Sequence, residues 1–157
     1  MRWNKLTLVL GLLTPFLFIL NSCQPDDALS QQTIYSKNGI VINGAQENPT
    51  NPSTGTGLLN VSYNKVTKLL NYNFTWSGLT GPVSAGHIHG LAPVGFNVGV
   101  VQPFSGLALA TAGTYSSSVV IDGAKIKEVD LLNGLYYVNL HTAAYPGGEI
   151  RGQIVFK

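Results

Sequence analysis

The chain has 157 residues, in which nine Lys and Arg face seven Asp and Glu, so its formal net charge at pH 7 is +2. The sequence has no basic stripe, which excludes the electrostatic pattern of a nucleic-acid-binding protein. Its single cysteine excludes a disulfide within the chain, so burial, backbone pairing or a metal ion must stabilise the fold.

The N-terminal residues have the layout of an export signal. Arg2 and Lys5 precede an apolar run of 15 residues from Leu6 to Leu20, and the chain turns polar after Cys23. A membrane-spanning helix needs ~20 apolar residues, so the run is short for an anchor and typical of a signal peptide. The pattern resembles a bacterial lipoprotein signal with lipidation at Cys23, although Asn21 departs from it; a plain anchor and a secreted protein are the alternatives.

These features predict three parts: a lipoprotein signal peptide over residues 1–22, a lipid-anchored tether over 23–36, and one domain over 37–157. Without the two basic residues of the signal, seven of the nine basic residues remain against seven acidic ones, so the mature chain is neutral. A neutral domain would be held at the membrane by its lipid anchor alone. We therefore expect a bacterial cell-envelope location, as an outer-membrane lipoprotein that faces the periplasm or the cell surface.

Short apolar runs separated by turn signals predict an all-β domain. The alternation is clearest at residues 70–76, where Phe74 and Trp76 are expected to face the core and Asn73 and Thr75 the other side. Lys125 to Leu132 has helical spacing and predicts one short helix. About eight short strands with regular turns favour an antiparallel β-sandwich. The expected strands are residues 40–42, 59–63, 70–76, 85–89, 100–104, 115–121, 136–141 and 149–156.

The chain's three histidines lie in two short segments. His87 and His89 fall on one face of a predicted strand, ~6.6 Å apart, where both imidazoles can reach one ion. His141 ends another strand and shares its face with Asn139. Imidazole nitrogens are ligands of zinc and copper, so the pattern suggests a three-histidine metal site. Histidines at strand ends also serve as structural hydrogen-bonding groups, and the pattern leaves that alternative open.

Other polar residues complete the candidate site without suggesting catalysis. Glu149 and Arg151 alternate with apolar residues in the last predicted strand, so we expect them, with Asn139, around the histidines as residues that orient the ligands. The sequence has no serine in a nucleophile elbow. Its carboxylates lie in separate segments without an acid/base pair. We therefore predict no catalytic residues.

Four motifs, taken together, resemble one known family. The segments Gly44–Pro49, Ala85–Gly90, Tyr137–Thr142 and Tyr145–Ile154 match the CHRD (chordin) domain in order. The resemblance implies an extracytoplasmic all-β module, of immunoglobulin-like or superoxide-dismutase-like architecture, without an established enzyme activity or ligand. It favours a non-enzymatic binding or structural module, with a protein or a surface glycan as partner.

A more distant likeness concerns the histidines. Copper/zinc superoxide dismutases also carry a Gly-x-His-x-His strand, a later histidine and a C-terminal arginine on an antiparallel sandwich. By that analogy, His87, His89 and His141 stand at copper-ligand positions, and Arg151 stands where an anion-steering arginine lies. The chain departs from the pattern because it has no fourth histidine, no separate zinc cluster and no disulfide. The alternative hypothesis is therefore a copper- or zinc-binding metalloprotein, with dismutase-like chemistry as one form of it.

Overall fold

The computed structural model describes residues 32–157; the predicted signal peptide, Cys23 and the first part of the predicted tether lie outside the described residues. Within the described part, no helix is both long enough and apolar enough to cross a membrane. The elements in chain order are β1 (Ile34–Asn43), η1 (Gly44–Gln46), β2 (Thr56–Asn64), β3 (Leu69–Ser77), β4 (Val83–Gly90), β5 (Val100–Pro103), β6 (Gly113–Val120), α2 (Glu128–Leu132), β7 (Tyr136–Thr142) and β8 (Ile150–Gln153).

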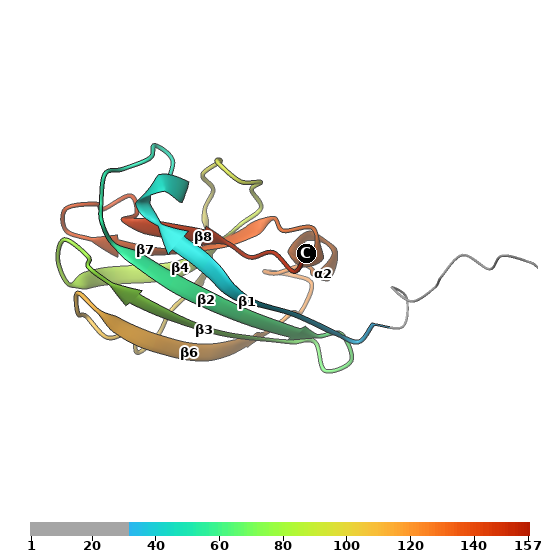
Figure 1. The fold of residues 1–157 in the computed structure, drawn as a ribbon. Coiled ribbons are helices and arrows are strands. Elements are labelled where there is room, and N and C mark those ends of the chain that lie inside the picture. The colour runs from blue at the N-terminus through green and yellow to red at the C-terminus, as the bar shows by residue number, and fades with distance from the viewer. Residues whose placement is uncertain (1–31) are drawn as a thin grey trace, which may run out of the picture. The chain divides into compact units, whose positions relative to one another are not determined.

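The eight strands form one antiparallel sheet in the order β5-β4-β7-β8-β1-β2-β3-β6. Figure 1 shows the sheet curling so that β4 and β7 lie over β2, β3 and β6. Buried side chains from both halves, including Phe74 of β3 and Ile88 of β4, belong to a single core cluster. The predicted fold class, an all-β antiparallel sandwich, is confirmed.

Strand β3 lies where the alternating pattern places it. Phe74 and Trp76 are buried, whereas Asn73 and Thr75 are exposed. The Phe74 ring lies 5.8 Å from Trp76, 5.2 Å from Phe104 and 5.4 Å from Tyr115, measured between ring centroids. These rings fill the core between β3, β6 and the segment after β5. The predicted orientation of the strand is therefore confirmed.

Several element boundaries differ from the sequence prediction, among them the start of β1, the start of the helix and the end of β8. Strand β1 begins at Ile34, within the predicted tether, because its first residues pair with β2 while their side chains stay largely exposed and give no apolar signal. The helix begins at Glu128 because the carboxylate of Asp122 accepts hydrogen bonds from the N–H groups of Ala124 and Lys125, which holds the preceding segment in a turn. Strand β8 ends at Gln153, three residues early.

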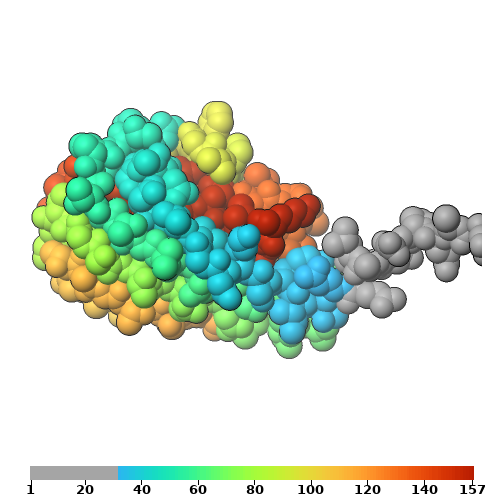
Figure 2. Space-filling view, in the orientation of Figure 1, coloured from blue at the N-terminus to red at the C-terminus, as the bar shows by residue number. Residues whose placement is uncertain are grey.

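The strands β4, β7 and β8 have one apolar and one polar face. Ile88, Val138 and Leu140 point into the core and are fully buried. The alternate positions of the same strands therefore point outward. Two segments lie together above that outer face: η1 with the residues that follow it, and residues 91–99, which are yellow in Figure 2. The polar face is thus covered by loops.

Candidate metal centre

The register of β4 and β7 brings the three histidines together. Ala85 pairs with His141 and His87 with Asn139, so His141 lies diagonally across from His87 on the same face. One nitrogen of each histidine lies within 4.8 Å of the other two. The ring centroids of His87 and His141 are 4.9 Å apart, and those of His87 and His89 are 5.4 Å apart. The residues predicted from the sequence as a cluster are a cluster in space.

Backbone carbonyl groups fix the orientation of two of the rings. The Nδ1 of His89 lies 2.8 Å from the carbonyl oxygen of Val98, and the Nδ1 of His141 lies 2.9 Å from that of Pro146. A carbonyl only accepts, so each Nδ1 carries a proton, and in this tautomer of imidazole the lone pair lies on Nε2. The Nδ1 of His87 lies 3.1 Å from the Nε2 of His141 and donates to it. The nitrogens that no backbone carbonyl holds therefore include Nε2 of His89 and the contacting pair of His87 Nδ1 and His141 Nε2.

One of these nitrogens is buried without a partner. The Nε2 of His89 makes no hydrogen bond within residues 32–157, and a buried polar atom in this state calls for an explanation. Burial lowers the pKa of His87 to about 4, with repulsion from His141 and His89 adding to the effect. Burial also lowers the pKa of His141. Both shifts favour the neutral form of His87 and His141, which is the form that binds a metal ion.

The donor set fits zinc or copper. Imidazole nitrogens without carboxylates are unsuited to calcium or magnesium, which prefer oxygen ligands. Nitrogens bound to one zinc ion at ~2.0–2.1 Å lie about 3.4 Å from each other in tetrahedral geometry. The three nitrogens lie within 4.8 Å of one another, so the widest pair would have to close by up to about 1.5 Å. His87 is partly exposed, which leaves the cluster accessible from solvent. Binding an ion would also move the proton of His87 from Nδ1 to Nε2.

A stack of three side chains supports His89 from its side. The Tyr137 ring is parallel to that of His89, with a centroid distance of 4.8 Å and an interplanar angle of 2°. The Arg151 guanidinium lies 3.4 Å from the centroid of the Tyr137 ring. Arg151 is fully buried and donates to Asn97 and Gln153 at 3.2 and 3.3 Å. Arg151 therefore supports His89 through Tyr137, to which the sequence pattern assigned no role at the site.

Glu149 lies in a different cluster. Its carboxylate accepts hydrogen bonds from the hydroxyls of Ser53, Thr80 and Thr142 and from the backbone N–H of Thr80. Although burial opposes it, these hydrogen bonds hold the pKa of Glu149 below its usual range. Thr142 points to the opposite side of β7 from His141. Among the residues that the structure describes, no hydrogen bond joins Glu149 to a histidine. Glu149 precedes the first residue of β8, so its side chain does not follow the alternation of that strand. Its hydrogen bonds instead tie the loops around Ser53 and Thr80 to the sheet.

Asn139 contacts a carboxyl group that the sequence did not place near it. Its Nδ2 donates to Oε1 of Glu47 at 3.1 Å, across 92 positions of the chain. Gly148 is needed at this point because a Cβ there would collide with both Asn139 and Glu47. Asn139 pairs with His87 on one side and with Arg151 on the other. The Glu47–Asn139 pair therefore borders the histidine cluster. In the sequence, the only feature that drew attention to Glu47 was the family motif of residues 44–49.

The Glu47 carboxyl should make stability depend on pH. Burial raises the pKa of Glu47 to about 7 from 4.5, although the Asn139 amide and the Arg151 guanidinium act to lower it. The folded state then binds this proton more tightly than the unfolded state does. The contribution of this group to the free energy of unfolding therefore falls as pH rises from 4.5 to about 7.

We expect Glu47→Gln to gain stability relative to the wild type over that window, by about 2–3 kcal/mol. Urea unfolding of both proteins at pH 4.5 and pH 8 measures the difference. Both proteins contain the same three histidines, so the contribution of these histidines to the pH dependence of stability drops out of the difference. An equal difference at the two pH values would show that this carboxyl titrates normally in the folded protein.

Comparison with known proteins gives one match. The family profile of the CHRD domain matches residues 39–154, which is nearly the whole of the described chain. The match includes the segments that carry the three histidines, Glu47 and Arg151. No curated protein and no solved structure matches the chain.

Proposed function

Since this chain belongs to the CHRD domain family, whose members share a small β-fold module, we propose that the module is a metal-binding domain. It holds one zinc or copper ion between His87, His89 and His141. Two observations on the same cluster carry this proposal: the Nε2 of His89 is buried without a partner, and one nitrogen of each of the three histidines lies within 4.8 Å of the other two. Structural histidines alone would each have their own partner, and the Nε2 of His89 has none within residues 32–157.

The surrounding residues support binding rather than catalysis. The carbonyls of Val98 and Pro146 accept the Nδ1 protons and so aim two Nε2 atoms at the common point. Tyr137 and Arg151 hold the plane of His89 from the side. Zinc in this site would act as a Lewis acid, and copper would add one-electron redox chemistry. The chain's own contribution is to bind the ion, and we assign it no catalytic group.

Metal loading tests the proposal. The full chain is incubated with excess zinc or copper(II), dialysed, and its metal content measured by elemental analysis. We expect one ion per chain for at least one of the two metals, because a single cluster of three nitrogens is available among the described residues. Retention of neither ion at pH 7 would contradict the proposal. The Gln102→Ala variant, altered on the neighbouring strand outside the cluster, should load like the wild type.

We further propose that the module is an exported, lipid-anchored protein of the bacterial envelope. The support is the sequence of residues 1–23: two basic residues, an apolar run too short to span a bilayer, and a cysteine at the expected cleavage point. The balanced charge of the rest of the chain gives it little attraction to a membrane surface. Attachment would then come from acyl chains, at ~0.8 kcal/mol per buried methylene.

Cys23→Ser tests the anchor. We expect the variant either to leave the membrane fraction or to accumulate as uncleaved precursor, because no other cysteine can accept the lipid. Fractionation of cells followed by mass spectrometry of the N-terminus distinguishes these forms. Detergent-extractable, cleaved and lipidated protein in the variant would contradict the assignment. Ser22→Ala, next to the cleavage point, should behave like the wild type.

A further inference from the structure

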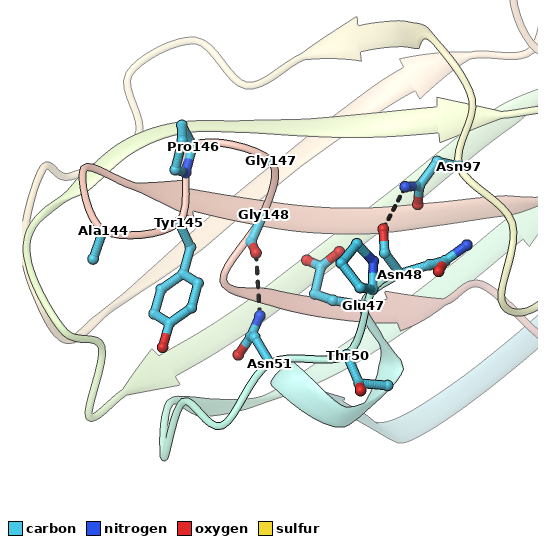
Figure 3. A pocket seen from close by; sticks show the side chains of 11 residues that line it. Glu47, Asn48, Thr50, Asn51, Asn97, Ala144, Tyr145, Pro146, Gly147 and Gly148 are labelled. Atoms are coloured by element: carbon cyan, nitrogen blue, oxygen red, sulfur yellow. Dashed lines mark hydrogen bonds between the residues drawn. The ribbon is translucent and has the colours of Figure 1, made fainter.

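A second candidate binding site lies beside the metal centre. A pocket of about 420 Å³ separates the turn of residues 144–148 from residues 47–51, with Asn97 at one end (Figure 3). Its volume falls in the range of small-molecule sites, about 300–1,000 Å³. Glu47 lies at its buried side, whereas Thr50 is exposed and Tyr145 half-buried at its rim. The histidines are not among its lining residues.

Most of the side-chain amide N–H groups of this pocket are used within the protein. The Nδ2 of Asn51 donates to the carbonyls of Gly148 and Glu149, at 3.3 and 3.0 Å. The Nδ2 of Asn48 donates to Gly95 at 2.7 Å, and that of Asn97 donates to the carbonyl of Asn48. These bonds fix the amides, so the pocket walls are preorganised and present few N–H groups to a ligand.

Oxygen atoms without partners remain in the pocket. Within residues 32–157, Oε2 of Glu47, Oδ1 of Asn48 and the hydroxyls of Thr50 and Tyr145 make no hydrogen bond. The Glu47 and Asn48 oxygens call for a ligand that donates hydrogen bonds, whereas the hydroxyls of Thr50 and Tyr145 can donate or accept. Hydroxyl groups on adjacent carbons suit both, since each can donate to one oxygen and accept from a hydroxyl of the protein.

The charges of the residues that line the pocket further restrict the ligands that it can bind. No Lys, Arg or His lines the pocket, which disfavours phosphates and carboxylates. Its single acidic residue, Glu47, already interacts with the positive charge of Arg151. A cationic ligand would therefore meet little uncompensated negative charge. Pro49 and Pro146 add apolar surface on the two sides, against which the C–H faces of a sugar ring can pack.

We propose that this pocket binds a neutral saccharide, as a terminal sugar of a glycan. Its hydroxyls donate to Glu47 and Asn48, and its ring packs against Tyr145 and the neighbouring prolines. No histidine lines the pocket, so we expect the affinity for sugar to be the same in EDTA and after zinc loading. The ligand class goes beyond the proposed metal binding, and each proposal can fail without the other.

Saturation-transfer NMR and calorimetry on the full chain test the site. The probes are the methyl glycosides of glucose, galactose, mannose and N-acetylglucosamine at millimolar concentrations, with methylammonium chloride and inorganic phosphate as charged probes. We expect binding of at least one glycoside and of neither charged probe. Tyr145→Ala should weaken the glycoside at least tenfold and Thr50→Ala at least threefold. The matched control Thr54→Ala, also an exposed threonine but outside the pocket, should bind as the wild type does.

Several results would overturn the proposal. They are the absence of a signal with all four glycosides, equal affinity of Thr50→Ala and Thr54→Ala, or stronger binding of methylammonium or phosphate than of any glycoside. Circular dichroism shows whether Tyr145→Ala is folded. If it is not, Tyr145→Phe, which removes only the hydroxyl, takes its place and should weaken binding at least threefold.

Discussion

Replacing Trp76 with alanine is expected to lower the free energy of unfolding by about 3–5 kcal/mol. The side chain is 2% exposed and its ring lies 5.8 Å from that of Phe74. Its Nε1 donates to the carbonyl of Ala110 at 3.1 Å, so the indole also ties the segment before β6 to β3. Truncation would leave a cavity and an unpaired carbonyl at the same place, and each of these destabilises the fold.

Chemical denaturation measures this effect, and the same strand offers a control. Thr75 is exposed on the other face of β3, so Thr75→Ala should change the free energy of unfolding by less than about 0.5 kcal/mol. If Trp76→Ala is too unstable to purify, Trp76→Phe keeps most of the buried surface and should lose less. A midpoint that is unchanged in Trp76→Ala, or lowered more in Thr75→Ala, would mean that the strand's two faces are reversed.

Replacing His89 with alanine is expected to lower the affinity for zinc or copper by more than about 100-fold, since loss of residues that merely support metal ligands already costs 10–100-fold. His89 is the histidine whose Nε2 is buried without a partner in the described chain. His87→Ala and His141→Ala should have effects of the same order. Competition with a chromogenic chelator gives the affinities, and Gln102→Ala is the control.

The three histidine variants also separate the two interpretations of the cluster. If the histidines only formed structural hydrogen bonds, the variants would lose stability, and the wild type would bind no more metal than they do. Equal metal content in the wild type and all three variants would therefore end the metal hypothesis. Metal loss that appears only together with unfolding, as judged by circular dichroism, would also count against it.

The sequence predicted those parts of the fold in which side-chain alternation reports the environment. Phe74 and Trp76 alternate with polar residues over a long strand, and their burial follows from that pattern. His87 and His89 share a face for the same reason, and the pairing of β4 with β7 adds His141. The start of β1 was missed because its side chains are exposed and its pairing is made by the backbone.

The parts of the site that could not be predicted from the sequence depend on contacts made by loops. The prediction that Glu149 lies by the histidines assumed that alternation continues into the turn, but the strand begins one residue later, at Ile150. Glu47 contacts Asn139 across 92 positions, through a loop whose path no periodic pattern reveals. The carbonyls of Val98 and Pro146 are backbone groups, so their role as acceptors for His89 and His141 depends on loop geometry alone.

The coordination of a bound ion tests the central claim most directly. X-ray absorption of the zinc-loaded full chain should show three imidazole nitrogens at ~2.0–2.1 Å, and two in His89→Ala if that variant retains the ion at high zinc concentration. A wild-type spectrum with one imidazole or none, or with the ion bound mainly by carboxylate oxygens, would contradict the assignment of His87, His89 and His141 as a metal centre.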